Sequence, residues 1–202
     1  EVVHELQKER GMSSGFLNSK GGKFAENLTA QRKLSDTAIS RLNESIRSID
    51  ASMVGPRYIK PLATVSAPLA ELEKKREQIT RLSLEPGESF RFYSETISQL
   101  LEIALRTGNQ MPSSKLSRLS NAKQAVLFLK ERNGQERGLV AGGFSAGRLT
   151  SEQFSTFQSL INDQATYLRL AIGYATPDQE KLLRAKLAEP IFKEVGTIEQ
   201  MV

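Results

Sequence analysis

Apolar residues recur along most of the chain at every third or fourth position, the spacing that places them on one face of an α-helix. In the first segment that face is made by Val2, Leu6, Ser13 and Leu17. The pair Gly21-Gly22 ends this first helix, and a second stripe runs from Phe24 towards Gly55-Pro56, which breaks it. No run alternates apolar and polar residues convincingly as a strand would, so the pattern predicts an all-α protein.

The middle of the chain continues with two further helices. The third covers 59–82, where Pro61 fits the first turn and Pro68 is expected to kink the helix. The fourth covers 90–104, and the segment 108–114 that follows contains glycine and proline among polar residues. This segment is the best internal boundary of the chain.

The second half of the chain repeats this style. A helix that begins near Leu116 leads into the segment 130–138, after which three glycines at 142, 143 and 147 are expected to loosen the chain. Thr150 and Thr176 are favourable N-caps for the last two helices, and Gln153 stands at the capping-box position of the first of them.

Long amphipathic helices with short loops pack as antiparallel up-and-down bundles. Each half has enough helices for about one bundle. We therefore expect a single domain over 1–202 that consists of two tethered four-helix-like bundles, 1–107 and 112–202. One elongated bundle that shares long helices is the alternative.

The composition narrows the chemistry that the chain can perform. Its 202 residues include no cysteine and one histidine, His4, which excludes disulfides and thiolate zinc sites and argues against a histidine metal cluster or a Ser-His triad. No pair of carboxylates stands out as an acid and a base, so we expect no enzyme, metal or cofactor. The formal net charge of +5 suits anionic ligands. Nucleic-acid proteins usually concentrate positive charge more strongly, so we expect no nucleic-acid contact.

A short motif occurs once in each half. The triplet Glu-Arg-Gly stands at 9–11 and again at 136–138, in each case shortly before a glycine and a phenylalanine. On a helix, Arg10 falls on the apolar side of the first segment, and Arg137 shares a partly apolar stripe with residues such as Val126. Both arginines are therefore expected to point inward.

A buried guanidinium needs a negative charge or hydrogen-bond acceptors, and two sources stay open. One is an internal ion pair with a glutamate: Glu5, Glu9, Glu131 or Glu136. The other is a small planar anion held between Arg10 and Arg137, because guanidinium forks match the geometry of oxyanions. Gly11 and Gly138 each cost a helix about 1 kcal/mol relative to alanine, which favours close packing beside both arginines.

Two long stretches of the chain resemble a known family. HELQKERGMSSGFL (4–17), followed by QRKLSDTAI (31–39), is similar to the opening signature of the NIT domain, the nitrate- and nitrite-sensing domain of bacterial receptors. FLKERNGQERGLVAGGFSAGRLTSEQFSTFQSLINDQ (128–164) is similar to its second conserved block. The resemblance implies an all-helical sensor that binds nitrate or nitrite through Arg10 and Arg137. It also implies residues that line or shape the pocket: Gly11, Ser13, Ser14 and Gly138, with further arginines at Arg32, Arg132 or Arg184.

The resemblance also suggests a setting for the domain. NIT domains serve chemoreceptors, histidine kinases, cyclic-dinucleotide enzymes and a transcription antiterminator, and in membrane-bound members they lie outside the cytoplasm between two transmembrane helices. Helical patterns at both ends of the chain favour that arrangement. We therefore expect a periplasmic domain of a bacterial inner-membrane receptor, with the cytoplasm as the alternative. The expected partners are nitrate or nitrite, a second copy in a homodimer, and a covalently linked output domain.

Two other functions stay open from the residues alone. The same architecture would serve a sensor for another small anion, such as a carboxylate metabolite. It would also serve a helical protein-interaction module in which the arginines pair only with glutamates and no ligand binds.

Overall fold

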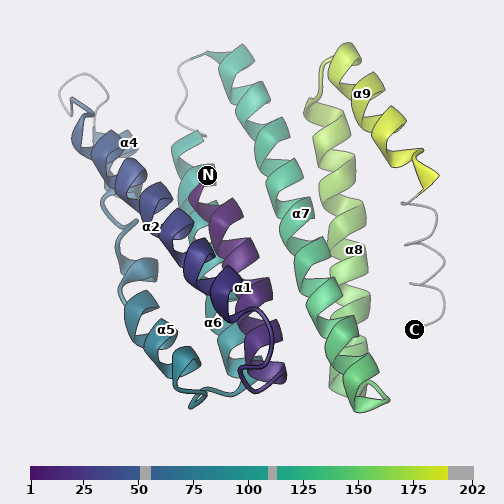
Figure 1. The fold of residues 1–202 in the computed structure, drawn as a ribbon. Helices are drawn as coiled ribbons and strands as arrows, with labels where there is room; N and C mark the ends of the chain where they lie inside the picture. The colour runs from purple at the N-terminus through teal and green to yellow at the C-terminus, as the bar shows by residue number, and fades with distance from the viewer. Residues whose placement is uncertain (51–55, 109–112, 191–202) are drawn as a thin grey trace.

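The computed structural model describes residues 1–50, 56–108 and 113–190. These residues form helices joined by short connections, and no strand occurs among them, so the all-α fold class is confirmed. In chain order the elements are α1 (Val2–Asn18), α2 (Ala25–Arg47), α4 (Pro56–Leu62), the 3₁₀ helix η1 (Ala67–Leu69), α5 (Leu72–Thr80), α6 (Pro86–Gly108), α7 (Ser114–Ala146), α8 (Ser151–Tyr174) and α9 (Pro177–Leu187). Figure 1 shows the long helices lying side by side.

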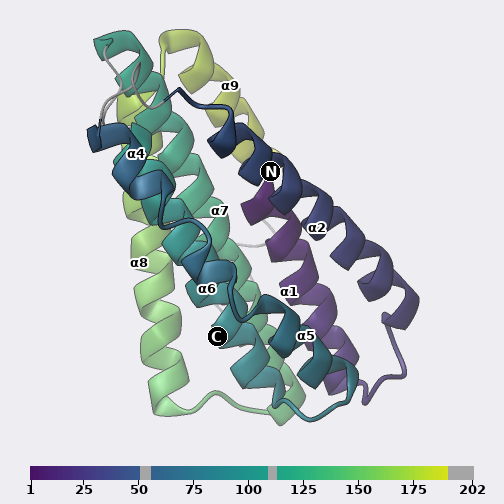
Figure 2. The same ribbon diagram turned by 90° about the vertical axis from the view of Figure 1, so that its left-hand side faces the viewer.

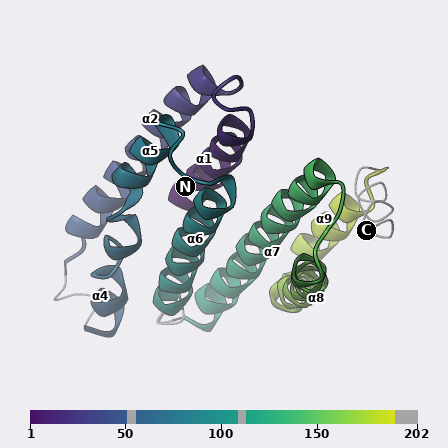
Figure 3. The same ribbon diagram turned by 90° about the horizontal axis from the view of Figure 1, so that it is seen from below.

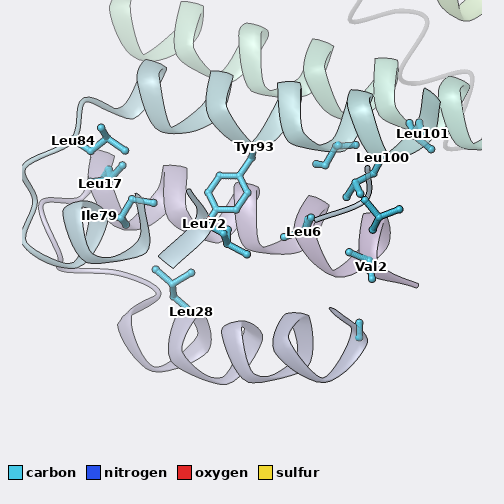
Figure 4. Packing of buried hydrophobic residues seen from close by; sticks show 13 residues of the cluster. Val2, Leu6, Leu17, Leu28, Leu72, Ile79, Leu84, Tyr93, Leu100 and Leu101 are labelled. Atoms are coloured by element: carbon cyan, nitrogen blue, oxygen red, sulfur yellow. The ribbon is translucent and has the colours of Figure 1, made fainter. Parts of the chain in front are cut away.

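α1 lies at the centre of the first half, where it packs against both α2 and α6 (Figure 3). Its inward face is the predicted one, because Val2, Leu6, Ser13 and Leu17 are all buried. Tyr93 of α6 is fully buried and lies among aliphatic side chains from the neighbouring helices (Figure 4). The main hydrophobic cluster of the described residues is therefore built around α1.

α7 is the first helix of the second half and lies between α6 and α8 (Figure 3). It packs extensively against α8 and also contacts α1 and α6. Leu127 and Phe128 pack against the core of the first half, and the Phe128 ring stacks on Tyr167 of α8 with centroids 5.1 Å apart. The division into 1–107 and 112–202 stays a prediction. α7, which belongs to the second part, contacts helices of both parts.

The single third helix predicted over 59–82 is wrong, because the structure divides it into α4, η1 and α5. α4 and η1 pack against α6, and α5 follows them in the chain (Figure 2). Arg76 of α5 is hydrogen-bonded to α1 and α2. Pro61 lies inside α4, and Pro68 lies in η1. α4 ends at Leu62, before Pro68 is reached, and Pro68 lies in the first turn of η1. A proline has no N–H to donate to the carbonyl four residues earlier, so Pro68 does not fit inside a continuous helix, and the segment is interrupted where a kink was expected.

The loosening expected at the glycines of the second half is also wrong for two of the three. α7 continues through Gly142 and Gly143 to Ala146, and the turn comes at Gly147, where φ is +75°. Gly143 is buried, and a Cβ at this position would overlap the Leu149 side chain. This glycine therefore makes room for the chain as it returns towards α8.

The helix starts predicted in the second half are confirmed. Thr150 begins α8 and Thr176 begins α9, each with a complete capping box to the glutamine three residues later. Three predictions lie outside the described residues: the break at Gly55, the central part of the boundary at 109–112, and the helical pattern over 194–202.

Candidate functional site

Arg10 is buried where α1, α6 and α7 meet. Its side chain is 3% exposed, as its place on the apolar face of α1 predicts. Nη1 donates to Ser94 Oγ of α6 at 2.8 Å and to Glu131 Oε1 of α7 at 2.5 Å. The guanidinium carbon lies 4.7 Å from the centroid of the Phe90 ring. Of the two sources of charge left open by the sequence, the structure therefore contains the ion pair with Glu131.

Glu131 is a completely buried carboxylate that is fully engaged by hydrogen-bond donors. Its Oε1 accepts from Arg10 and from Gln135 Nε2 at 2.9 Å, and its Oε2 accepts from Gln7 Nε2, also at 2.9 Å. The donors come from α1 and from α7 itself. Such a carboxylate is stable in a dry interior only while these partners hold it.

Two glycines of α7 allow this junction to close. A Cβ at Gly134 would come within 2.6 Å of Arg10 Nη2, and a Cβ at Gly138 would overlap the Phe90 ring. The close packing expected at Gly138 is therefore found, although it is against a side chain. The close packing expected at Gly11 is wrong, because that glycine is exposed and a Cβ there would meet nothing within 4 Å.

The inward orientation predicted for Arg137 is wrong. Its side chain is exposed, and within the described residues it makes no ion pair or hydrogen bond. The stripe that contains Val126 faces outward, whereas Glu131, Gly134 and Gly138 form the side of α7 that contacts the first half. Arg137 lies beside that contacting side, about one turn beyond Gly134. The structure therefore does not bring Arg10 and Arg137 into one buried cavity.

The other predicted arginines have protein partners. Arg32 donates to Thr80 Oγ1 at 2.8 Å and to the Arg76 carbonyl at 3.1 Å. Arg132 donates to Asp163 of α8 at 2.8 Å and to Gln135 Oε1 at 2.9 Å. Arg184 is exposed and pairs with Glu180. Only Arg132 is linked to Arg10, through Gln135 and Glu131.

The two predicted serines lie on different sides of α1. Ser13 is fully buried on the side of the hydrophobic core. Ser14 is half-buried one turn after Arg10, and its Oγ has no hydrogen-bond partner among the described residues. Of the two serines, Ser14 is the one that follows Arg10 by four residues and so lies on the same face of α1.

A second buried charge cluster was missed by the sequence interpretation. Arg76 of α5 donates two hydrogen bonds to the Glu9 carboxylate, at 2.7 and 2.9 Å. The Tyr93 hydroxyl donates to the same carboxylate at 2.8 Å. Arg76 also donates to Asp36 of α2 at 2.6 Å. Arg76 stands in the sequence KKR (74–76) beside several glutamates, a composition that is typical of a solvent-exposed helix face. The helical spacing from Leu72 was the signal that pointed inward.

This cluster is electrostatically strong. Burial acts to raise the pKa of the Glu9 carboxyl, but the hydrogen bonds and charge of Arg76 outweigh it, and the pKa lies below its ordinary value of 4.5. Burial and the neighbouring Glu9 charge raise the pKa of the Tyr93 hydroxyl. Because both guanidinium edges of Arg76 are engaged by carboxylates, this cluster is suited to hold helices together.

Within the described residues, no helix is long and apolar enough to cross a bilayer. A search of the same residues finds no group of side chains that would hold a metal ion.

Comparisons with known proteins match all or most of the chain. A family model described as nitrate and nitrite sensing, NIT, matches residues 1–202. A relative named nitrate regulatory protein, from Klebsiella oxytoca, is 27% identical over 184 residues, which are 90% of this chain and 46% of the relative. A solved structure of the NasR transcription antiterminator has a TM-score of 0.86 and 25% identity, covering 93% of this chain and 51% of that one. The chain thus spans about half the length of each.

These similarities correct two expectations. The periplasmic receptor of the inner membrane is overturned, because the similar proteins are named as a nitrate regulatory protein and a transcription antiterminator. The expectation of receptor partners without nucleic acid is overturned by the same finding, because one similar protein is named as a transcription antiterminator. The weak concentration of positive charge misled that interpretation, because the charge of these 202 residues does not indicate the process in which similar proteins act.

Proposed function

The chain belongs to the NIT family of nitrate- and nitrite-sensing domains, and from this premise we propose that Arg10 and Arg137 together bind one nitrate or nitrite ion. The domain is a sensor that performs no catalysis. It acts within a regulator of transcription, in the cytoplasm where transcription takes place, and anion binding changes how its helices are arranged.

The observation that carries this proposal is the carboxylate held by Arg10. The junction of α1, α6 and α7 already holds a planar oxyanion, the side chain of Glu131, in a buried setting with fixed donors. Guanidinium N–H groups recognise carboxylate and nitrate through the same geometry. The local chemistry therefore suits a planar anion better than a spherical or tetrahedral one.

The charges near the junction favour a monovalent guest. Arg10 and Arg137 carry two positive charges and Glu131 carries one negative charge, so the three side chains together leave one positive charge uncompensated. One bound nitrate or nitrite would compensate this remaining charge. Arg137 must then fold inward over the junction, so the bound form differs from the structure described above.

Such a movement would give the sensor its signal. A ligand shifts an equilibrium between two helix arrangements only if it binds one of them more tightly. Arg137 is presented by α7 and Arg10 by α1, so an anion that bridges them favours the arrangement in which these helices hold both side chains close together.

Calorimetric titration with nitrate, nitrite, sulfate and acetate tests the proposal. We expect heat of binding with nitrate or nitrite and weaker binding of sulfate. Tighter binding of acetate than of either would favour the sensor for a carboxylate metabolite. Absence of both binding heat and a thermal shift with every anion would contradict the proposal.

One observation favours the ligand-free interaction module as the second candidate. Arg10 is already satisfied by Glu131, as a purely structural arginine would be. The module makes a distinct prediction, since a structural pair requires no second arginine nearby and Arg137 would then be dispensable for every property of the isolated domain.

A further inference from the structure

The carboxylate of Glu131 also indicates where the anion binds and which neutral side chains hold it. We infer that nitrate or nitrite takes the place of this carboxylate, keeps Arg10 as its cationic partner, and gains Gln7 and Gln135 as hydrogen-bond donors. This inference rests on the proposed function and adds to it a ligand set and an internal competitor.

Two of the three donors around Glu131 are held in place by other side chains before any ligand arrives. Gln135 Oε1 accepts from Arg132 Nη1 at 2.9 Å, so its amide nitrogen is directed at Glu131. Arg10 is fixed by Ser94 and by the Phe90 ring. Donors whose orientation is fixed in advance lose little entropy when they bind a ligand.

Gln7 completes the set from the α1 side. Its amide nitrogen donates to Glu131 Oε2 at 2.9 Å, and its buried Oε1 has no partner among the described residues. Gln7 therefore contributes to this junction through its N–H group, which an incoming oxyanion would also accept. Nitrate and a carboxylate both present planar oxygen acceptors, so the same donors fit either.

Binding must occur by exchange and not by addition. Two negative charges that share one buried guanidinium repel one another strongly, so Glu131 has to leave Arg10 when the anion enters. Glu131 belongs to α7, and its bond to Arg10 ties that helix to α1. A free anion bound to Arg10 is not covalently part of α7, so it does not join the two helices in this way. Exchange thus removes one direct link between the two halves.

The same exchange reaches α8 through existing hydrogen bonds. Asp163 of α8 accepts from Arg132, which donates to Gln135, which in turn donates to Glu131. When a free anion replaces the Glu131 carboxylate, the last acceptor in this series of hydrogen bonds is no longer part of the protein. Exchange at Arg10 therefore affects the contacts of α7 with α1 on one side and with α8 on the other.

Glu131 competes with the ligand at the high effective concentration of a tethered group. Its replacement by glutamine keeps the size of the side chain and removes the competing charge. Glu136→Gln is the matched control, because Glu136 is also buried and neighbours the site in sequence, but its carboxylate accepts from Gln164 of α8 at 2.6 Å.

Calorimetry of nitrate binding to the wild type and both variants provides the test. We expect Glu131→Gln to bind nitrate about tenfold more tightly or better, and Glu136→Gln to stay within about twofold of the wild type. Unchanged or weaker binding by Glu131→Gln, or equal tightening by Glu136→Gln, overturns the inference. If neither the wild type nor Glu131→Gln binds nitrate, the proposed function has failed as well.

Two uncharged substitutions test the ligand set separately. Gln7→Met and Gln135→Met each remove one donor, and we expect each to weaken nitrate binding about fivefold or more with an unchanged circular dichroism spectrum. Wild-type affinity in both overturns the ligand set.

Glu131→Gln leaves Arg10 without its carboxylate, so its folding is followed as sodium nitrate or sodium chloride is added. We expect the melting temperature of Glu131→Gln to rise towards the wild-type value at a lower concentration of nitrate than of chloride. Equal responses to the two salts overturn the inference.

Discussion

Arg10 is buried against Glu131, whereas Arg137 is exposed about one turn beyond Gly134 on α7. The repeated Glu-Arg-Gly triplet therefore does not give its two arginines equivalent environments. Because of this asymmetry, we expect Arg10 to contribute to both folding and anion binding, and Arg137 to contribute to anion binding alone.

Arg10→Ala should lower the free energy of unfolding by about 3–5 kcal/mol, because it leaves the buried Glu131 without its cation. Arg137→Ala should change it by less than about 0.5 kcal/mol, because an exposed side chain without partners among the described residues is removed. Urea unfolding followed by circular dichroism measures both. A large loss of stability in Arg137→Ala would show that the exposed position described here is wrong.

The Glu9 cluster makes stability depend on pH. The pKa of Glu9 is lowered in the folded state, so the unfolded state takes up the proton first as the pH falls. The contribution is complete well above 4.5 and is lost as the pH falls through the folded pKa, at about 1.4 kcal/mol for each unit by which the pKa is lowered. Urea unfolding at pH 7, 5 and 3.5 should show a decreasing free energy. A flat profile over this range would contradict it.

At this scale the sequence predicted what a helix face can decide. Arg10 lies three and four residues from buried positions of an evident apolar stripe, so its burial followed. Arg137 lies on a helix that is covered on two sides, by α8 and by α1 with α6. A single apolar face cannot describe such a helix, and the Val126 stripe was the wrong one. The pairing of Arg10 with Glu131 depends on how the helices pack, which periodicity does not contain.

Among the elements, α7 carries most of the site because its glycines let it approach α1 and α6. Gly134 lies against Arg10 and Gly138 against Phe90. Sequence periodicity predicted the long helices and their N-caps well, because caps and apolar stripes are local features. It failed for the third helix, where two prolines divided the segment, and for the end of α7, where glycines proved to be helical.

The two glycines next to the triplet arginines provide a matched pair of substitutions. Gly138→Ala should destabilise the domain by about 1–3 kcal/mol, because its methyl group overlaps the Phe90 ring. Gly11→Ala should stabilise it by about 0.5–1 kcal/mol, because the site is open and alanine favours the helix. Thermal and urea unfolding of both variants measure this contrast. Equal effects would show that α7 does not approach α6 as described.

At the scale of the whole molecule, few polar side-chain contacts join α1 and α7 among the described residues. Besides Arg10–Glu131 and Gln7–Glu131, the Lys130 ammonium lies 2.6 Å from His4 Nδ1. Two of these three contacts involve Glu131, so a change at that one carboxylate alters most of the polar link between α1 and α7. The sequence indicated two related halves, but not that a single carboxylate would connect them.

The most direct measurement is a calorimetric titration of nitrate into the wild type, Arg137→Ala and Arg106→Ala. Arg106 is the control, since it is an exposed arginine near the end of α6 whose loss changes the net charge equally. We predict that Arg137→Ala abolishes nitrate binding while Arg106→Ala binds within about twofold of the wild type. Nitrate binding by Arg137→Ala with wild-type affinity would contradict the two-arginine site.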